Sequence, residues 1–404
     1  MKKYILKKRI FAVVFLLVIF SFSILNFMHS FEPLKTLLSD EDRTEAISVE
    51  EIEASINENL LGKMNFIETY GYIQVLMDKR ENNNFSSIMD EDGYLHYASF
   101  FREDDPYIFE YAMRLKRLQD CVKTNGTKVL FVVTPGKYIE GQTEFREGIS
   151  VNNPDPVVNE LLFYLNRLGV ETLDLRTCIP NENITYEETF FKTDHHWTIP
   201  AAFYAMGEVV NKIEESFGED LDPEDYYTDI SNYDIVTYKK GMLGSMGRKT
   251  GVVYSGLEDF TALWPRYEGD FYRESVVDSN MVKQELEGNF VEAFVDTDLL
   301  LKKDNVYSDS QYSLYLNGLC LYEHIINNEN PDGASFLMIR DSYFSPVMAF
   351  MMPMCGRMDA IWSLEETNEY DIESYVKEEK YDYIIMEIYP YNIENKAFNF
   401  FKEE

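Results

Sequence analysis

The run KVLFVVT, residues 128–134, decides the fold of this 404-residue chain. Its five central residues are apolar, and three of them are valine. A run without polar alternation is typical of a strand that is buried on both faces of a sheet. The preceding segment Pro106–Thr124 carries apolar residues at helical spacing and ends at Asn125-Gly126, as a capped helix does. A helix followed by a doubly buried strand indicates an α/β architecture.

The alternation of helix and strand continues along the chain. Further helices are predicted at residues 156–168, 199–217, 344–354 and 371–379, and strands at residues 170–175, 335–339, 359–363 and 381–389. Strands that alternate with helices form βαβ units. We therefore expect an α/β fold with a mostly parallel sheet and helices on both faces.

Residues 218–334 interrupt this alternation. They are rich in Tyr, Asp and Gly and contain short β-like runs at residues 233–238, 251–255 and 290–295. We interpret them as an insertion that forms a lid or one wall of a cleft. The predicted organisation is an anchor at residues 1–30, a helical region at 31–90, and a catalytic domain with this insertion at 91–404.

The N-terminus carries a targeting element. Five basic residues lie within Met1–Arg9, and Ile10–Met28 follows without a charge. About 20 apolar residues span a bilayer as a helix, whereas the apolar core of a secretory signal is shorter. The basic flank stays in the cytoplasm by the positive-inside rule. We predict a single-pass signal anchor with the catalytic domain outside the cell membrane; a cleaved signal peptide is the alternative.

The charge of the chain limits its partners. The net charge is −34, which argues against nucleic acid because phosphate contacts need clusters of Lys and Arg. A neutral or amino-sugar glycan agrees better with an acidic surface, although acidity can also serve solubility alone. None of the four cysteines forms a C-x-x-C pair, so no thiolate metal site is predicted.

Two distant segments, TDHHWT at residues 193–198 and IRDSY at residues 339–343, carry the candidate chemistry. They offer the carboxylate of Asp194, the imidazole of His196 and the hydroxyl of Ser342, the parts that activate a serine nucleophile. Each segment lies at a predicted strand-to-helix junction, and ligands of open α/β sheets bind at the carboxyl ends of the strands. We therefore expect the three groups to meet on one rim of the sheet.

Each of these residues also has an ordinary explanation. A serine or aspartate at such a junction is commonly a helix N-cap. Paired histidines occur in metal sites, but here the further ligands of a full shell are missing, so no metal and no cofactor are predicted. Phosphoesterases with an Asp-His-His motif need further Asp motifs near the N-terminus, where this chain has its predicted anchor.

The TDHHWT segment resembles the signature of the DHHW proteins, which are related to the alginate O-acetyltransferases of the SGNH/GDSL hydrolase superfamily. As in the alginate-type enzymes, the Asp/His block precedes the Ser block, a circular permutation of the usual order. The resemblance spans residues 50 to 395 approximately and includes weaker matches at Asp92–Leu95, Thr134–Lys137, Met242–Ser245 and Tyr381–Tyr389.

The resemblance implies an exported, membrane-anchored O-acyltransferase that acetylates a cell-surface polysaccharide through an acyl-serine. Such enzymes commonly work beside a multi-pass membrane O-acyltransferase, which would be the acyl donor. The family pattern favours His196 over His195 as the base. Residues in the Asp/His block, in the Ser block and in the Thr134–Lys137 match are expected to contact substrate. They are Arg340, His195, Trp197, Tyr343 and Lys137.

The serine block departs from the family pattern. Arg340 stands where Gly is usual, so its side chain is expected either to crowd the turn or to bind an anion in the cleft. Two alternatives to the acyltransferase stay open: a carbohydrate esterase with the same triad and water as acceptor, and a non-catalytic glycan-binding protein.

Overall fold

The computed structural model describes residues 2–39, 47–82, 85–97, 106–149, 151, 153–277, 281–301, 306–307, 310–364, 371–394 and 396–402. Residues 94–101, which are strand-like in sequence, lie partly outside them, and their described part forms the short strand β3 (Leu95–His96).

An eight-stranded sheet organises the molecule, in the order β5-β4-β13-β11-β12-β10-β8-β9. The first five strands are mutually parallel, and the last three join antiparallel. Their bounds are β5 Glu171–Asp174, β4 Lys128–Val133, β13 Tyr383–Ile388, β11 Ser335–Arg340, β12 Arg357–Trp362, β10 Tyr322–Asn327, β8 Phe271–Val276 and β9 Lys283–Gly288. The predicted mostly parallel sheet is confirmed.

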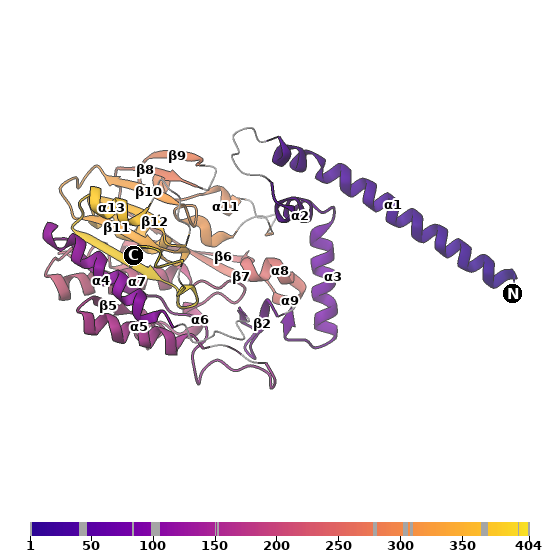
Figure 1. Ribbon diagram of the computed structural model, residues 1–404, viewed down its shortest axis with the longest axis horizontal. Coiled ribbons are helices and arrows are strands. Elements are labelled where there is room, and N and C mark those ends of the chain that lie inside the picture. Colours follow the sequence, from indigo (N-terminus) through magenta and orange to yellow (C-terminus); the bar gives the residue numbers. More distant parts are fainter. Residues whose placement is uncertain are drawn as a thin grey trace.

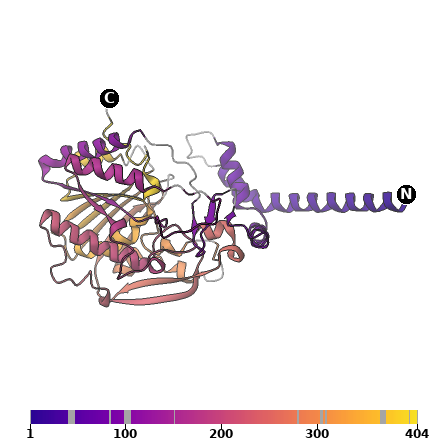
Figure 2. The same ribbon diagram turned by 90° about the horizontal axis from the view of Figure 1, so that it is seen from below.

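Helices cover both faces of this sheet (Figure 2). One layer contains α4 (Ile108–Val122), α5 (Asp155–Leu168) and α13 (Ile372–Glu378), and the other contains α7 (Ile199–Phe217) and α12 (Ser345–Met351). Successive residues of β4 point into the two different cores. Because both faces of β4 are buried, its sequence needs no polar alternation.

Part of the segment 218–334, which was predicted to form a lid or one wall of a cleft, belongs to the main sheet. Its strands β8, β9 and β10 extend the main sheet, while β6 (Tyr233–Met242) and β7 (Glu258–Pro265) form a separate two-stranded ribbon. Two runs expected to be β-like are helical instead, as α9 (Val252–Ser255) and α10 (Phe290–Phe294). A capping box of Asn289 and Glu292 starts α10, a local signal that outweighs the β propensity of its apolar residues.

The N-terminal region lies on one side of the sheet domain, and α1 (Lys2–Leu38) extends away from it (Figure 1). The helix α1 is long and apolar enough to cross a membrane, and its apolar window is not buried against protein. Two helices follow, as predicted: α2 (Val49–Glu58) and α3 (Lys63–Leu76). The remaining short elements are β1 Glu81–Asn82, β2 Ser87–Met89, α6 Tyr186–Thr189, α8 Ser245–Thr250 and α11 Asp298–Leu301.

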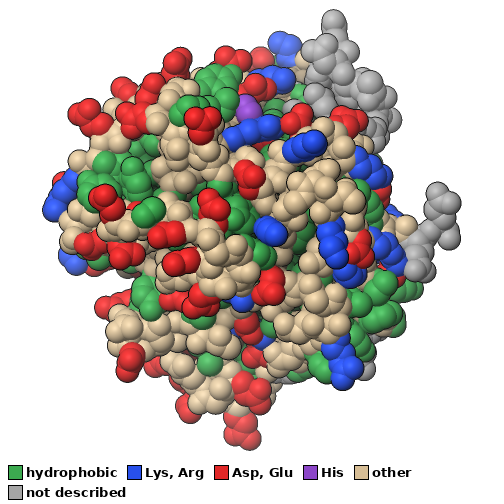
Figure 3. Space-filling view, turned by 90° about the vertical axis from the view of Figure 1, so that its left-hand side faces the viewer, with side chains coloured by type: hydrophobic (Ala, Val, Ile, Leu, Met, Phe, Trp, Pro, Cys, Tyr) green, Lys and Arg blue, Asp and Glu red, His purple; other side chains and the backbone are tan. Residues whose placement is uncertain are grey.

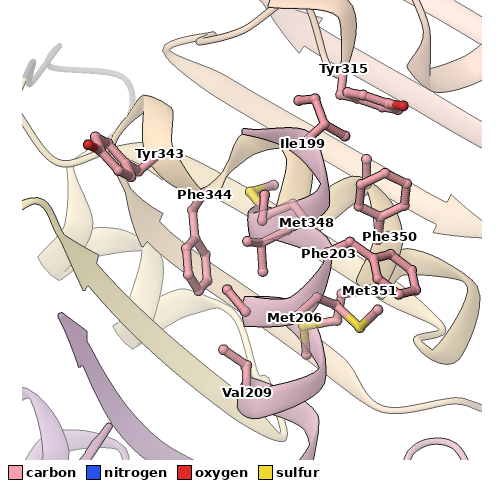
Figure 4. Close-up of a cluster of buried hydrophobic side chains, with 14 of the residues drawn as sticks. Ile199, Phe203, Met206, Val209, Tyr315, Tyr343, Phe344, Met348, Phe350 and Met351 are labelled. Carbon is pink, nitrogen blue, oxygen red and sulfur yellow. The ribbon is translucent and has the colours of Figure 1, made fainter. Parts of the chain in front are cut away.

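The centre of one core is an aromatic and methionine cluster between α7 and α12 (Figure 4). Every residue of α12 is buried. The ring of Phe203 on α7 lies 5.3 Å from that of Phe350 on α12 and 4.8 Å from that of Tyr233 on β6. This cluster therefore fixes the helix that follows the serine segment.

Truncating Phe203 tests this core. We expect Phe203→Ala to lower the free energy of unfolding by about 3 kcal/mol, because it removes buried apolar surface and leaves a cavity. The exposed Ile235→Ala on β6 is the control and changes stability by less than about 0.5 kcal/mol. Urea midpoints of the detergent-solubilised chain measure both. An unchanged midpoint for Phe203→Ala would contradict the packing described here.

Candidate active site

A short loop between two bridged residues carries Asp194, His195 and His196. Phe190 and Trp197 close it as an antiparallel bridge. Thr198 then caps α7, because its hydroxyl accepts from the N–H of Ala201. The TDHHWT segment is therefore a loop whose two ends are fixed by the Phe190–Trp197 bridge and by the start of α7. It places the two histidines at one edge of the sheet.

Ser342 lies directly beyond the carboxyl end of β11, at the first position of the 3₁₀ turn η5 (Ser342–Phe344). The carboxylate of Asp341 accepts from the N–H of Tyr343 in this turn. Its other oxygen accepts from the N–H of Tyr389 and from the side-chain amide of Asn392. Asp341 thus ties the serine turn to the segment that follows β13.

The structure brings the three predicted groups into one hydrogen-bonded chain. Nδ1 of His196 lies 2.6 Å from Oδ1 of Asp194, and Nε2 lies 2.8 Å from Oγ of Ser342. With the ring proton on Nδ1, Nε2 accepts from the serine hydroxyl. Ser342 is partly exposed, whereas Asp194 is buried. This geometry suits proton transfer from the serine to the imidazole.

The second oxygen of Asp194 is held as well. It accepts from the backbone N–H of Ser245 at 2.6 Å. Burial opposes its ionisation, but the adjacent charge and hydrogen bond of His196 hold the pKa of Asp194 well below its usual value. A carboxylate that stays ionised can orient the imidazole and stabilise an imidazolium.

Among the described residues, Asp194, His195 and His196 form the only cluster of possible metal ligands. Both ring nitrogens of His196 and both oxygens of Asp194 already take part in hydrogen bonds. A metal would have to displace these partners, so the arrangement fits a proton relay better than a metal centre.

Comparison with known proteins finds a family model that matches part of this chain. Residues 88–246 match the family described as an SGNH hydrolase-like domain, acetyltransferase AlgX. This segment is similar to the SGNH hydrolase-like domain of AlgX. The matched segment includes the TDHHWT loop and Ser245, while Ser342 lies outside it. The match confirms the predicted relationship and the predicted class, an enzyme of the SGNH type.

Solved structures share the fold. PatB1 from Bacillus cereus superposes with a TM-score of 0.61 at 16% identity and covers 78% of this chain and 99% of that chain. A DHHW family protein from Eubacterium siraeum gives a TM-score of 0.57 at 17% identity and covers 80% of this chain and 98% of that chain. No curated protein matched the chain.

In the SGNH-like domain, several residues expected to contact substrate instead form the frame of the site. The buried Lys137 ammonium donates to the backbone carbonyls of Phe191 and Asp194, at 2.9 and 2.6 Å. Burial lowers the pKa of Lys137 to about 8. The indole N–H of Trp197 donates to the carbonyl of Tyr343 at 3.1 Å. The hydroxyl of Tyr343 in turn donates to the carbonyl of His195. The contacts of Trp197 and Tyr343 hold the histidine loop and the serine turn together.

Arg340 occupies a different place from the one expected. It is fully buried and pairs with Glu323 of β10, which also pairs with Arg273 of β8. Side chains alternate along a strand, and Arg340 shares the core-facing side of β11 with Met338. It therefore neither crowds the serine turn nor faces the cleft.

His195 is the expected contact residue that remains partly exposed, at 20% of its side chain. Its ring centre lies 3.8 Å from that of His196, and its Nδ1 lies 3.3 Å from the hydroxyls of Tyr97 and Ser245. Burial, followed by the nearby charge of His196, lowers the pKa of His195 to about 3. A neutral His195 therefore borders the base without competing for its proton.

The sequence pattern gave no role to Tyr312. Its ring stacks on that of His196, with centres 3.8 Å apart, and its hydroxyl donates to the carbonyl of Tyr343. It lies in the segment without helix and strand alternation, so only the folded chain reveals it. Glu258 was missed for the same reason: its carboxylate accepts from the N–H groups of Lys192 and Thr193.

A cavity of about 1040 Å³ lies between α7 and the β6–β7 ribbon, and Ser342 is not part of its lining. Acidic side chains surround it, among them Glu187, Glu208, Asp225, Asp229 and Asp259. Figure 3 shows that Asp and Glu side chains are spread over one face of the molecule and are denser on its left than on its right. A recess of only about 10 Å³ borders the catalytic loop, lined by Tyr97, His195 and Tyr389 among others.

Gly244 must be a glycine for the Asp194 contact to form. An added Cβ would lie 2.4 Å from Cβ of Asp194 and 2.5 Å from the carbonyl of Thr193. We expect Gly244→Ala to slow labelling of Ser342 by a serine-directed fluorophosphonate about 100-fold, since small misplacements are costly in such sites. The matched control is Gly207→Ala, whose Cβ would meet nothing within 4 Å. Equal labelling rates for the two variants would refute the role of this contact.

Glu387 is expected to make the stability of the protein depend on pH. It is fully buried on β13 and accepts from the N–H of Asp341 at 3.1 Å. Burial, together with the charge of Asp341, raises the pKa of Glu387 well above its usual 4.5. The folded state therefore keeps a proton that the unfolded state has lost, and stability falls as pH rises above the unfolded pKa.

We expect Glu387→Gln to remove this dependence. Relative to the parent, the variant should gain about 1.4 kcal/mol of stability for each pH unit between the unfolded and the folded pKa. Thermal midpoints at about pH 5 and about pH 8 measure the gain, with the exposed Glu160→Gln as control. A stability difference that is independent of pH would show that Glu387 has no raised pKa.

Proposed function

We propose that this protein is an exported, membrane-anchored O-acetyltransferase that acetylates a cell-surface polysaccharide through Ser342, His196 and Asp194. The observation that carries the proposal is the continuous hydrogen-bonded chain from Asp194 through His196 to Ser342. The match to a family described as an acetyltransferase supports the type of group transferred.

The proposed reaction has two halves. In the first, Oγ of Ser342 attacks the acetyl carbonyl of the donor while Nε2 of His196 takes the serine proton. The tetrahedral intermediate collapses to acetyl-Ser342, and His196 returns the proton to the departing group. In the second half, a sugar hydroxyl loses its proton to Nε2 of His196 and attacks the acetyl-serine. The tetrahedral intermediate releases the acetylated sugar as the bond to Oγ breaks, and His196 returns the proton to Oγ of Ser342.

The oxyanion of each tetrahedral intermediate needs donors. The N–H of Ser342 is the first of η5, where no preceding turn supplies an acceptor. We assign it as one such donor. Asp194, held by Ser245, would stabilise the imidazolium that forms in each half.

The proposed location follows from α1. With its basic flank inside, this helix would anchor the SGNH-like domain on the extracytoplasmic side. A multi-pass membrane O-acyltransferase is the proposed acyl donor, and a polysaccharide of low negative charge is the proposed acceptor, because the net charge of −34 would repel a polyanion.

Acetyl release from an activated acetyl ester by the detergent-solubilised chain tests the triad. We expect Ser342→Ala, His196→Ala and Asp194→Asn each to lower kcat at least about 1000-fold, since removing any member disables the unit. Ser216→Ala, at the far end of α7, is the control and retains the parent rate. Variants that fold and retain activity would exclude the triad assignment.

Adding candidate polysaccharides to the same assay separates transfer from hydrolysis. The acetyl group should appear on a sugar hydroxyl at the expense of free acetate, because the acceptor competes with water for acetyl-Ser342. Release of acetate alone, whatever glycan is present, would identify an esterase instead.

A further inference from the structure

The helix α3 carries mostly apolar and aromatic side chains, yet most of them are exposed. Of its residues, only Gly71 and Gln74 are buried. Its exposed large apolar side chains include Phe66, Tyr70, Tyr72, Ile73, Val75 and Leu76, and the last is 67% exposed. A large exposed apolar patch marks a surface that contacts another protein or a membrane.

The charged residues of α3 do not interrupt this surface. The carboxylate of Glu68 turns towards the SGNH-like domain and accepts from the N–H groups of Val252 and Val253 at the start of α9. Lys63 stands at the first position of the helix. The outward positions are therefore apolar, aromatic or uncharged, and tyrosine is enriched where proteins meet the membrane interface.

The first turn of α3 lies beside the apolar segment of α1. The rings of Phe22 and Phe66 are 5.8 Å apart in an edge-on contact. The side-chain oxygen of Asn26 accepts from the N–H of Leu61 at 2.8 Å. Phe22 precedes Met28, the end of the uncharged segment, by six residues, or about 9 Å of helix. If α1 spans the bilayer, Phe66 lies at the depth of its outer end.

We propose that α3 lies in the outer-leaflet interface of the membrane and docks the SGNH-like domain onto the lipid surface. This proposal rests on the membrane anchor of the proposed function. The occupant is lipid because the apolar surface of α3 is continuous with the apolar segment of α1. Interfacial helices bury their apolar side chains about 5–10 Å into the headgroup and acyl boundary.

The docked helix is also connected to the catalytic carboxylate. Gly71 of α3 packs so closely against Thr250 of α8 that an added Cβ would lie 2.5 Å from its carbonyl oxygen. At the other end of α8, the N–H of Ser245 holds Asp194. The contacts of α3 with α8 and α9 therefore fix the orientation of the catalytic loop relative to the membrane, where an acetyl group delivered through the bilayer would emerge.

Fluorescence quenching by brominated lipid tests the proposal. The full chain is reconstituted in phosphatidylcholine–phosphatidylglycerol nanodiscs with either brominated or ordinary acyl chains, and single tryptophans are added. Leu76→Trp probes α3, and Phe15→Trp probes the span. Ile235→Trp is the matched control, because Ile235 is an exposed apolar residue on β6. Emission is read as the difference from the parent in the same discs, since the chain has three native tryptophans.

The expected result is strong quenching of Leu76→Trp and Phe15→Trp and none of Ile235→Trp. Quenching of Phe15→Trp without quenching of Leu76→Trp would overturn the docking of α3 and leave the anchor intact. An unquenched Phe15→Trp would refute the anchor and the docking together. Quenching of Ile235→Trp as strong as that of Leu76→Trp would place another face on the lipid and overturn the proposal. Release of acetate from the activated ester, measured on the same samples, reports on the triad independently.

Discussion

The contact between Nε2 of His196 and Oγ of Ser342 is the interaction on which the rest of the site depends. It joins residues 146 positions apart in the chain. Serine is a weak nucleophile at neutral pH, so the hydroxyl and the imidazole must be held at hydrogen-bond distance without waiting for a rearrangement. Much of the surrounding structure holds the serine hydroxyl and the imidazole at this distance. The central strand β11 and the fully buried α12 hold the serine turn, and the contacts of Lys137, Trp197 and Ser245 hold the histidine loop.

The site contains several buried charges, and burying them costs free energy of folding. Buried ions are costly unless hydrogen bonds and opposite charges compensate them. Asp194 has its imidazole and an N–H, and Lys137 has three backbone carbonyls. Glu323 lies between Arg273 and Arg340. Lys137 and Arg340, which were expected to contact substrate, are instead held by buried neighbouring groups. They therefore support the serine and histidine segments and do not face the cleft.

Sequence reasoning reached the parallel half of the sheet because each of its strands is a local apolar run next to a helical pattern. It also predicted that Asp194, His196 and Ser342 would meet. For Ser342 the expected position after a strand is observed, whereas the TDHHWT loop follows the short helix α6 and not a strand of the sheet. It did not reach the strands β8, β9 and β10, because their sequences are largely polar and contain no continuous apolar run, and nothing local shows that β10 pairs with β12. The ion pair of Arg340 depends on Glu323, and the stacking of Tyr312 on His196 depends on the fold of residues 218–334. Such contacts between distant segments leave no local pattern.

The central claim is that Ser342 carries the acetyl group during the reaction. The most direct test is to quench the reaction of the full chain with an activated acetyl ester at early times and to map the acetylated peptide by mass spectrometry. The account predicts one acetyl group on the peptide that contains Ser342, formed in the parent and absent in Ser342→Ala. An acetyl group on another residue, or turnover with no acetylated Ser342 at any time, would contradict it.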